Sequence, residues 1–91
     1  MPTFRVEFKP RALKDIEALD TEDRLKVMAR IYLLKNNSFP EGSKKLETKN
    51  NLWRDRVGDY RIIYQVQKKV LLVLVVRVGD RKEIYKNLGK Y

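Results

Sequence analysis

Three strand-like runs follow one another in the second half of the chain, with only short turns between them. They cover residues 52–57, 60–67 and 70–78. Gly58-Asp59 gives a tight reversal between the first two, and Gln67-Lys68-Lys69 turns the chain into the third. The third run is rich in Val and Leu, which is typical of a central strand covered on both faces. This region therefore predicts a three-stranded antiparallel meander.

An opening strand precedes the meander. Phe4, Val6 and Phe8 alternate with charged residues, which is the period-two pattern of a half-buried strand. Pro10 suits the first turn of a short amphipathic helix over residues 10–19. The apolar residues of that helix are Ala12, Leu13, Ile16, Ala18 and Leu19.

A second helix is predicted from Thr21, its expected N-cap, to about residue 35. Carboxylates in its first turn complement the positive end of the helix dipole. Its predicted core stripe consists of Leu25, Met28, Ala29 and Tyr32, widened by Val27, Ile31 and Leu34. A polar loop is expected after it, up to residue 51.

The order of these elements predicts an α+β fold. We expect one domain over residues 1–91, with an N-terminal strand, two helices on one face of a single sheet, the antiparallel meander, and a short helix or ordered tail over residues 81–88. Charges interrupt every apolar run before it reaches the length of a membrane span, and the start lacks the layout of a signal peptide. A cytoplasmic protein with no membrane partner is predicted.

Positive charge is concentrated in the second half of the chain. The net charge is +9, from 21 Lys+Arg and 12 Asp+Glu. Residues 1–43 carry eight basic and seven acidic side chains, whereas residues 44–91 carry thirteen and five. An excess of this size favours a polyanionic partner, with nucleic acid ahead of other candidates.

The chain has no His and no Cys. That composition excludes thiolate nucleophiles, Cys/His zinc sites, Ser-His-Asp triads and disulfides. We predict no metal and no cofactor, so catalysis would depend on Arg, Lys, Tyr, carboxylates or hydroxyls.

Five residues stand out as a possible phosphate site. Arg54 and Arg56 lie two apart on one strand and share a face, and pairing across the Gly58-Asp59 turn brings Arg61 beside them. Like charges placed opposite each other cost stability, so such a cluster favours an anionic ligand. Arg81 follows Gly79, which we expect to let the chain turn where a side chain would crowd a ligand, and Tyr85 offers a ring on which a base can stack.

Simpler interpretations stay open for these residues. Arg61 could pair with Asp55 or Asp59, and Tyr85 could pack against the sheet. Trp53 is expected in the core. Arg77 interrupts an apolar strand, so its stem should lie along the sheet with its head at an edge.

The sequence resembles the RelE branch of the RelE/ParE toxin superfamily. The resemblance spans nearly the whole chain, through Arg11-Ala12-Leu13-Lys14, Lys44-Lys45-Leu46, the stretch LWRDRVGDYRIIYQV over residues 52–66, Val78-Gly79-Asp80-Arg81, and Glu83-Ile84-Tyr85. Its most specific piece is VGDYRIIY. It implies a toxin of a type II toxin–antitoxin pair that enters the ribosomal A site and cuts the mRNA codon there. It also implies a metal-free reaction in which the RNA 2′-hydroxyl is the nucleophile and a cyclic phosphate is left.

The resemblance also implies roles and partners. Arg61 would stabilise charge on the phosphate, Arg81 would assist the leaving 5′-oxygen, Tyr85 would orient the nucleotide, and Arg54 and Arg56 would grip the backbone and help activate the 2′-hydroxyl. The lysines expected to contact RNA or the ribosome are Lys44, Lys45, Lys49, Lys68 and Lys82. A RelB-like antitoxin is the expected partner, with the toxin monomeric when free and hetero-oligomeric with its antitoxin.

Some members of this branch carry lysines where this chain has Arg54 and Arg56. Arginine stays charged at all physiological pH values, so Arg56 is a poor general base. Two alternatives therefore remain beside the ribonuclease: a ParE-like protein that inhibits DNA gyrase without catalysis, and a domain that binds RNA or the ribosome without cutting.

Overall fold

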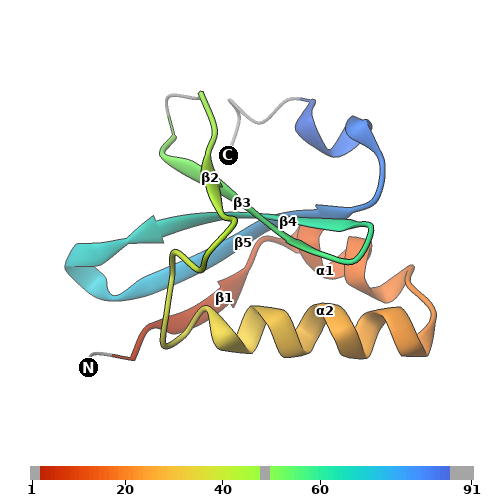
Figure 1. The fold of residues 1–91 in the computed structure, drawn as a ribbon, viewed down its shortest axis with the longest axis horizontal. Coiled ribbons are helices and arrows are strands. Elements are labelled where there is room, and N and C mark those ends of the chain that lie inside the picture. Colours follow the sequence, from red (N-terminus) through yellow and green to blue (C-terminus); the bar gives the residue numbers. More distant parts are fainter. Residues whose placement is uncertain (1–2, 48–49, 87–91) are drawn as a thin grey trace.

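The computed structural model describes residues 3–47 and 50–86, and they form the predicted α+β arrangement (Figure 1). The elements in chain order are β1 (Arg5–Phe8), α1 (Pro10–Glu17), α2 (Thr21–Leu33), β2 (Lys44–Lys45), β3 (Leu52–Val57), β4 (Tyr60–Gln67), the 3-10 turn η1 (Lys68–Val70), β5 (Leu72–Gly79) and the 3-10 helix η2 (Lys82–Tyr85). No helix in this described part is both long and apolar enough to cross a membrane.

One five-stranded sheet in the order β1-β5-β4-β3-β2 organises the fold. The β3–β4–β5 meander is antiparallel as predicted, and β1 joins the edge of β5 in parallel. The sequence analysis missed β2, a two-residue strand on the opposite edge, because a lysine pair inside a polar loop carries no strand periodicity. The third strand begins at Leu72 rather than at residue 70, since Leu71 adopts a left-handed backbone conformation (φ 51°) after η1.

The two faces of the sheet differ in what covers them. Both α-helices lie on one face, and η2 lies on the other (Figure 1). The larger apolar cluster, on the helix side, includes Ala12, Ile16, Val27, Ile31, Leu34, Ile62, Tyr64, Val66, Val73, Val75 and Val78. A smaller cluster of Leu52, Ile63, Val76 and Ile84 lies under η2. β5 thus contributes to both clusters, as predicted for a strand covered on two faces.

The helices present different faces from those predicted. Val27 and Ile31 are fully buried, whereas Leu25 and Tyr32 are 66% and 57% exposed. The predicted stripe on α2 is therefore wrong for Leu25, Ala29 and Tyr32, whereas Met28 packs against the core as predicted. The residues expected to widen the stripe form most of the actual core face. This helix carries two overlapping apolar stripes. Arg30, next to Ile31, binds Asp55 of the sheet, and this contact turns the stripe with Val27 and Ile31 toward the core.

The ends of the helices also differ from prediction. α1 buries Ala12 and Ile16, while Leu13 is 46% exposed. The N-cap of α2 is Asp20, which accepts a hydrogen bond from the Asp23 amide at 2.9 Å, so Thr21 is the first helical residue instead of the cap. After β5 the chain forms η2 over Lys82–Tyr85, the described part of the helix or tail predicted for residues 81–88.

An ion pair between α2 and β3 fixes the helix layer on the sheet. Arg30 Nε and Nη2 donate to the two carboxylate oxygens of Asp55 at 2.5 and 3.0 Å. Asp55 is 1% exposed. The hydrogen bond that Arg30 donates to Asp55 raises the pKa of Arg30 above its ordinary value. Removing one member of such a pair leaves the other charge buried without compensation.

We predict that Arg30→Met lowers the free energy of unfolding by about 3 kcal/mol, because the Asp55 carboxylate then stays buried without its partner. Urea denaturation measures this change. The matched control is Arg5→Met, which breaks the exposed ion pair with Glu7 and should cost less than about 1 kcal/mol. Equal losses in the two variants would contradict a structural role for the buried pair.

Candidate functional site

The register of β3 against β4 brings three arginines onto one face of the sheet. Arg56 lies directly opposite Arg61, and Arg54 lies opposite Ile63, two positions along the same face. Lys44 of β2 pairs with Arg54 from the other side. This face is the one that carries η2, since Ile63 belongs to the cluster under it. We call Arg54, Arg56 and Arg61, together with Arg81, which follows β5 and lines a pocket at its end, the arginine face.

The arginine face has no carboxylate partner among the described residues. Within the described ranges, the salt bridges involve none of its four members. Arg61 pairs with neither Asp55 nor Asp59, the simpler alternative weighed above: Asp55 points to the helix side, and Arg61 Nη1 donates to the backbone carbonyl of Asp80 at 3.1 Å. The guanidinium groups thus keep their charge available for an external anion.

η2 places an aromatic ring beside these arginines. The Arg61 guanidinium carbon lies 5.9 Å from the centre of the Tyr85 ring, within range of a cation–π interaction. Ile84, 4% exposed, anchors η2 against the sheet. A Cβ added to Gly79 would lie 2.6 Å from Ile84 Cγ2. Gly79 is therefore required for the close approach of Ile84, rather than for the turn or ligand clearance that the sequence predicted.

Two donors on this face are buried without a partner among the described residues. Arg54 Nε and the Tyr85 hydroxyl are both inaccessible to solvent and make no hydrogen bond there. An unsatisfied buried donor costs about 1–3 kcal/mol. Both atoms lie beneath the surface, so this cost falls on the folded structure itself.

The predicted lysines do not form one patch. Lys44 lies on the arginine face, and Lys82 is exposed on η2. Lys45 pairs with Trp53, so it lies on the opposite face of the sheet. Lys68 follows the end of β4 away from Arg61, and its ammonium group lies 5.3 Å from the Phe39 ring centre. Lys49 lies outside the described residues.

Trp53 packs against the core as predicted, whereas Arg77 holds an ion pair with α1 that the sequence did not predict. Trp53 is half-buried against the helix-side core, with its ring centroid 4.5 Å from that of Phe39. The Arg77 side chain is 11% exposed, and its guanidinium binds Asp15 of α1 at 2.7 and 3.3 Å. Neither residue belongs to the arginine face.

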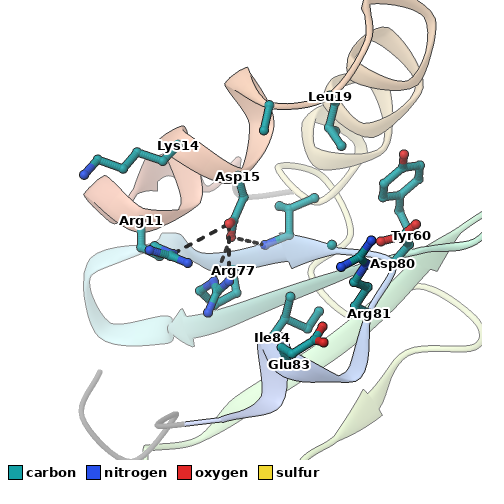
Figure 2. Close-up of a pocket in the computed structure, with 13 residues that line it drawn as sticks. Arg11, Lys14, Asp15, Leu19, Tyr60, Arg77, Asp80, Arg81, Glu83 and Ile84 are labelled. Atoms are coloured by element: carbon teal, nitrogen blue, oxygen red, sulfur yellow. Dashed lines mark hydrogen bonds and ion pairs between the residues drawn. The ribbon is translucent and has the colours of Figure 1, made fainter.

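A pocket of about 630 Å³ opens beside Arg81, between α1 and the end of β5 (Figure 2). Arg11 and Lys14 of α1 line it, together with Tyr60 at the start of β4. The Tyr60 hydroxyl donates to Asp23 at 2.9 Å, and this hydrogen bond raises the pKa of Tyr60 to about 12. The sequence analysis had assigned no role to the α1 cations, although their three-residue spacing on a helix already placed them on one face.

Comparison with known proteins identifies close relatives. Residues 6–85 match the family described as "ParE toxin of type II toxin-antitoxin system, parDE". The chain is 30% identical over 87 residues to a protein of Methanocaldococcus jannaschii named "Putative toxin RelE1", covering 92% of this chain and 97% of that one.

Two solved structures carry the same fold at similar identity. RelE in the archaeal RelE–RelB complex from Pyrococcus horikoshii is 26% identical with a TM-score of 0.77, over 88% of this chain and 97% of that one. A free mutant of the E. coli toxin RelE is 26% identical with a TM-score of 0.80, over 99% and 97% of the two chains.

We predict that Gly79→Ala displaces η2, because the new methyl group collides with Ile84. Hydrogen exchange should show faster exchange of the Ile84 amide, with a global loss of about 1–3 kcal/mol. Ile84→Ala removes the colliding Cγ2 atom, so the Gly79→Ala and Ile84→Ala substitutions together should cost less stability than the sum of their separate costs. Unchanged protection of Ile84 in the single variant would show that η2 does not depend on this contact.

Proposed function

The chain belongs to the ParE toxin family of type II toxin–antitoxin systems, and to its RelE branch, and from this premise we propose that it is a ribosome-dependent endoribonuclease. Its partner is a RelB-like antitoxin. The proposed substrate is the mRNA codon in the ribosomal A site. We propose that the toxin works in the cytoplasm and enters that site as a monomer.

The arginine face is the observation that carries this proposal. A phosphodiester in the transition state of cleavage gains negative charge on its non-bridging oxygens, and fixed cations in a partly dry site stabilise that charge strongly. The four arginines have no carboxylate partner among the described residues, and Arg61 lies beside the Tyr85 ring, which suits this task. Arg61, Arg81 and Tyr85 together also distinguish the ribonuclease from the ParE-like gyrase inhibitor, which generally lacks them as a set.

The proposed reaction is an internal transfer at phosphorus. The 2′-oxygen attacks the adjacent phosphorus, and its proton leaves to water or a ribosomal group. The bond to the 5′-oxygen breaks, that oxygen takes up a proton from water, and a 2′,3′-cyclic phosphate and a 5′-hydroxyl remain. Arg61 is held by the Asp80 carbonyl and would stabilise the phosphate charge. Arg81 would stabilise the leaving 5′-oxygen, Arg54 would bind the RNA backbone, and Tyr85 would orient the nucleotide.

Arg56 would act by charge alone. It lies opposite Arg61, so each guanidinium raises the positive potential felt by the other. Such a group can stabilise a developing 2′-oxyanion, but it cannot accept the proton at neutral pH.

Programmed ribosomes test the proposal directly. Incubation with the purified toxin should produce mRNA ends within the A-site codon, detected by primer extension, while the same mRNA without ribosomes stays intact. Arg81→Ala should lower the single-turnover rate about 10²–10³-fold, as expected for loss of one donor to the transition state. Arg5→Ala is the matched control, because Arg5 lies on the far edge strand, and it should cleave at the wild-type rate.

Two results would overturn the proposal. Inhibition of DNA gyrase without ribosome-dependent cuts would assign the chain the gyrase-inhibitor role. Tight binding to ribosomes with no cleavage would leave an RNA-binding domain.

We predict that Arg56→Lys raises the single-turnover cleavage rate at neutral pH. A lysine surrounded by cations has a lowered pKa and can accept the 2′-hydroxyl proton, which arginine cannot. Rapid-quench measurement at saturating toxin isolates this step from ribosome binding. An unchanged or lower rate would contradict the assignment of a purely electrostatic role to Arg56.

A further inference from the structure

The pocket beside Arg81 has cations on two opposing walls. Arg11 and Lys14 project from α1, and Arg81 lies across the pocket, after β5 (Figure 2). Lys14 forms no salt bridge in the described part of the chain, and Arg11 only approaches Asp15, at 3.8 Å. These groups lie outside the arginine face except for Arg81, which borders both regions.

Asp15, the carboxylate near Arg11, already accepts hydrogen bonds from other groups. Asp15 accepts from Arg77 at 2.7 and 3.3 Å and from the Val78 amide at 3.0 Å. The Asp15 and Arg77 side chains are only 12% and 11% exposed. Because Asp15 is held by these donors, it has little capacity left to neutralise Arg11, and the α1 end of the pocket stays positive.

The remaining acids lie elsewhere in the pocket. Asp80 and Tyr60 are at the end away from Arg11 and Lys14 (Figure 2). Asp80 also borders a second, smaller pocket with Asp23 and Asp59. Glu83 lies on η2, below Arg81 in the same view. The end formed by α1 is therefore suited to an anion, while at the opposite end the charge of Arg81 lies among carboxylates.

We propose that this pocket is a second phosphate subsite, in which Arg11 and Lys14 hold the phosphate of the nucleotide on the 3′ side of the cleaved bond. The inference rests on the proposed function, because Arg81 there meets the leaving 5′-oxygen and so defines the direction of the RNA. On the 3′ side of the cleaved bond, the RNA would run from Arg81 into the pocket, where Arg11 and Lys14 are the next cations. A volume of about 630 Å³ lies within the range of small-molecule sites and accommodates one nucleotide.

A double-mutant cycle between protein and RNA tests the subsite. Ribosomes are programmed with mRNA that carries a 2′-deoxy nucleotide at the cut, so that binding is measured without cleavage. The linkage one step 3′ of the cut is either a phosphate or an uncharged methylphosphonate. Wild-type toxin should bind the methylphosphonate mRNA roughly tenfold more weakly, since one charged contact is lost.

Lys14→Ala and Arg11→Ala should each weaken binding to the normal mRNA and lose most of the sensitivity to the methylphosphonate. Lys14→Ala should also reduce the salt dependence of binding by about one phosphate contact. Lys26→Ala is the matched control: it removes one exposed lysine from α2, outside this pocket, and should keep the full methylphosphonate effect. Circular dichroism of each variant verifies folding.

If Lys14→Ala and the methylphosphonate have additive effects on the free energy of ribosome binding, the subsite proposal is wrong. It is also wrong if Lys14→Ala toxin binds ribosomes normally but binds the antitoxin weakly. The proposed function is judged separately, by cleavage of the same mRNA with its 2′-hydroxyl restored. If cleavage occurs and the cycle is additive, only the subsite is wrong. If binding is coupled but no cut appears, the subsite stands and the ribonuclease assignment is wrong.

Discussion

The buried ion pair between Arg30 and Asp55 is the interaction on which the arrangement of charge depends. Asp55 lies between Arg54 and Arg56 in sequence, but strand alternation turns it to the opposite face, where α2 supplies its partner. The same contact fixes the rotation of α2 over the sheet. As a result, the acid nearest to the arginines in sequence stabilises the scaffold and cannot neutralise them.

Placing like charges side by side lowers the stability of the fold, and apolar packing on the other face of the sheet compensates for this loss. Arg56 and Arg61 oppose each other directly, and two buried donors on the η2 side lack partners among the residues that the structure describes. The larger apolar cluster, with both α-helices, lies on the far side of the sheet and supplies most of the burial that stabilises the fold. On the arginine side, the buried apolar surface of the described residues comes from the small cluster under η2. The packing of Ile84 against Gly79 is therefore important for the stability of that side.

Strand periodicity and turn chemistry were sufficient to predict the meander and to place Arg54, Arg56 and Arg61 on one face, because these features depend on local spacing. The face of α2 was mispredicted, since two apolar stripes were available and a contact with Asp55, 25 residues away, selects one. The roles of Gly79, Asp15 and Lys14 likewise depend on contacts between distant segments. A pairing such as Asp15 with Arg77, 62 residues apart, leaves no periodic signal.

The central claim is that cleavage by this chain relies on fixed positive charge rather than on a titrating base. The pH dependence of the single-turnover rate on programmed ribosomes tests it most directly. Arginines do not titrate between pH 6 and 9, so the logarithm of the rate should rise steadily with pH over that range, as the 2′-hydroxyl loses its proton more readily. A plateau or a bell-shaped profile with an apparent pKa near neutrality would contradict the claim, provided that it changes on substitution of Arg56 and is not seen with the same ribosomes in the absence of toxin.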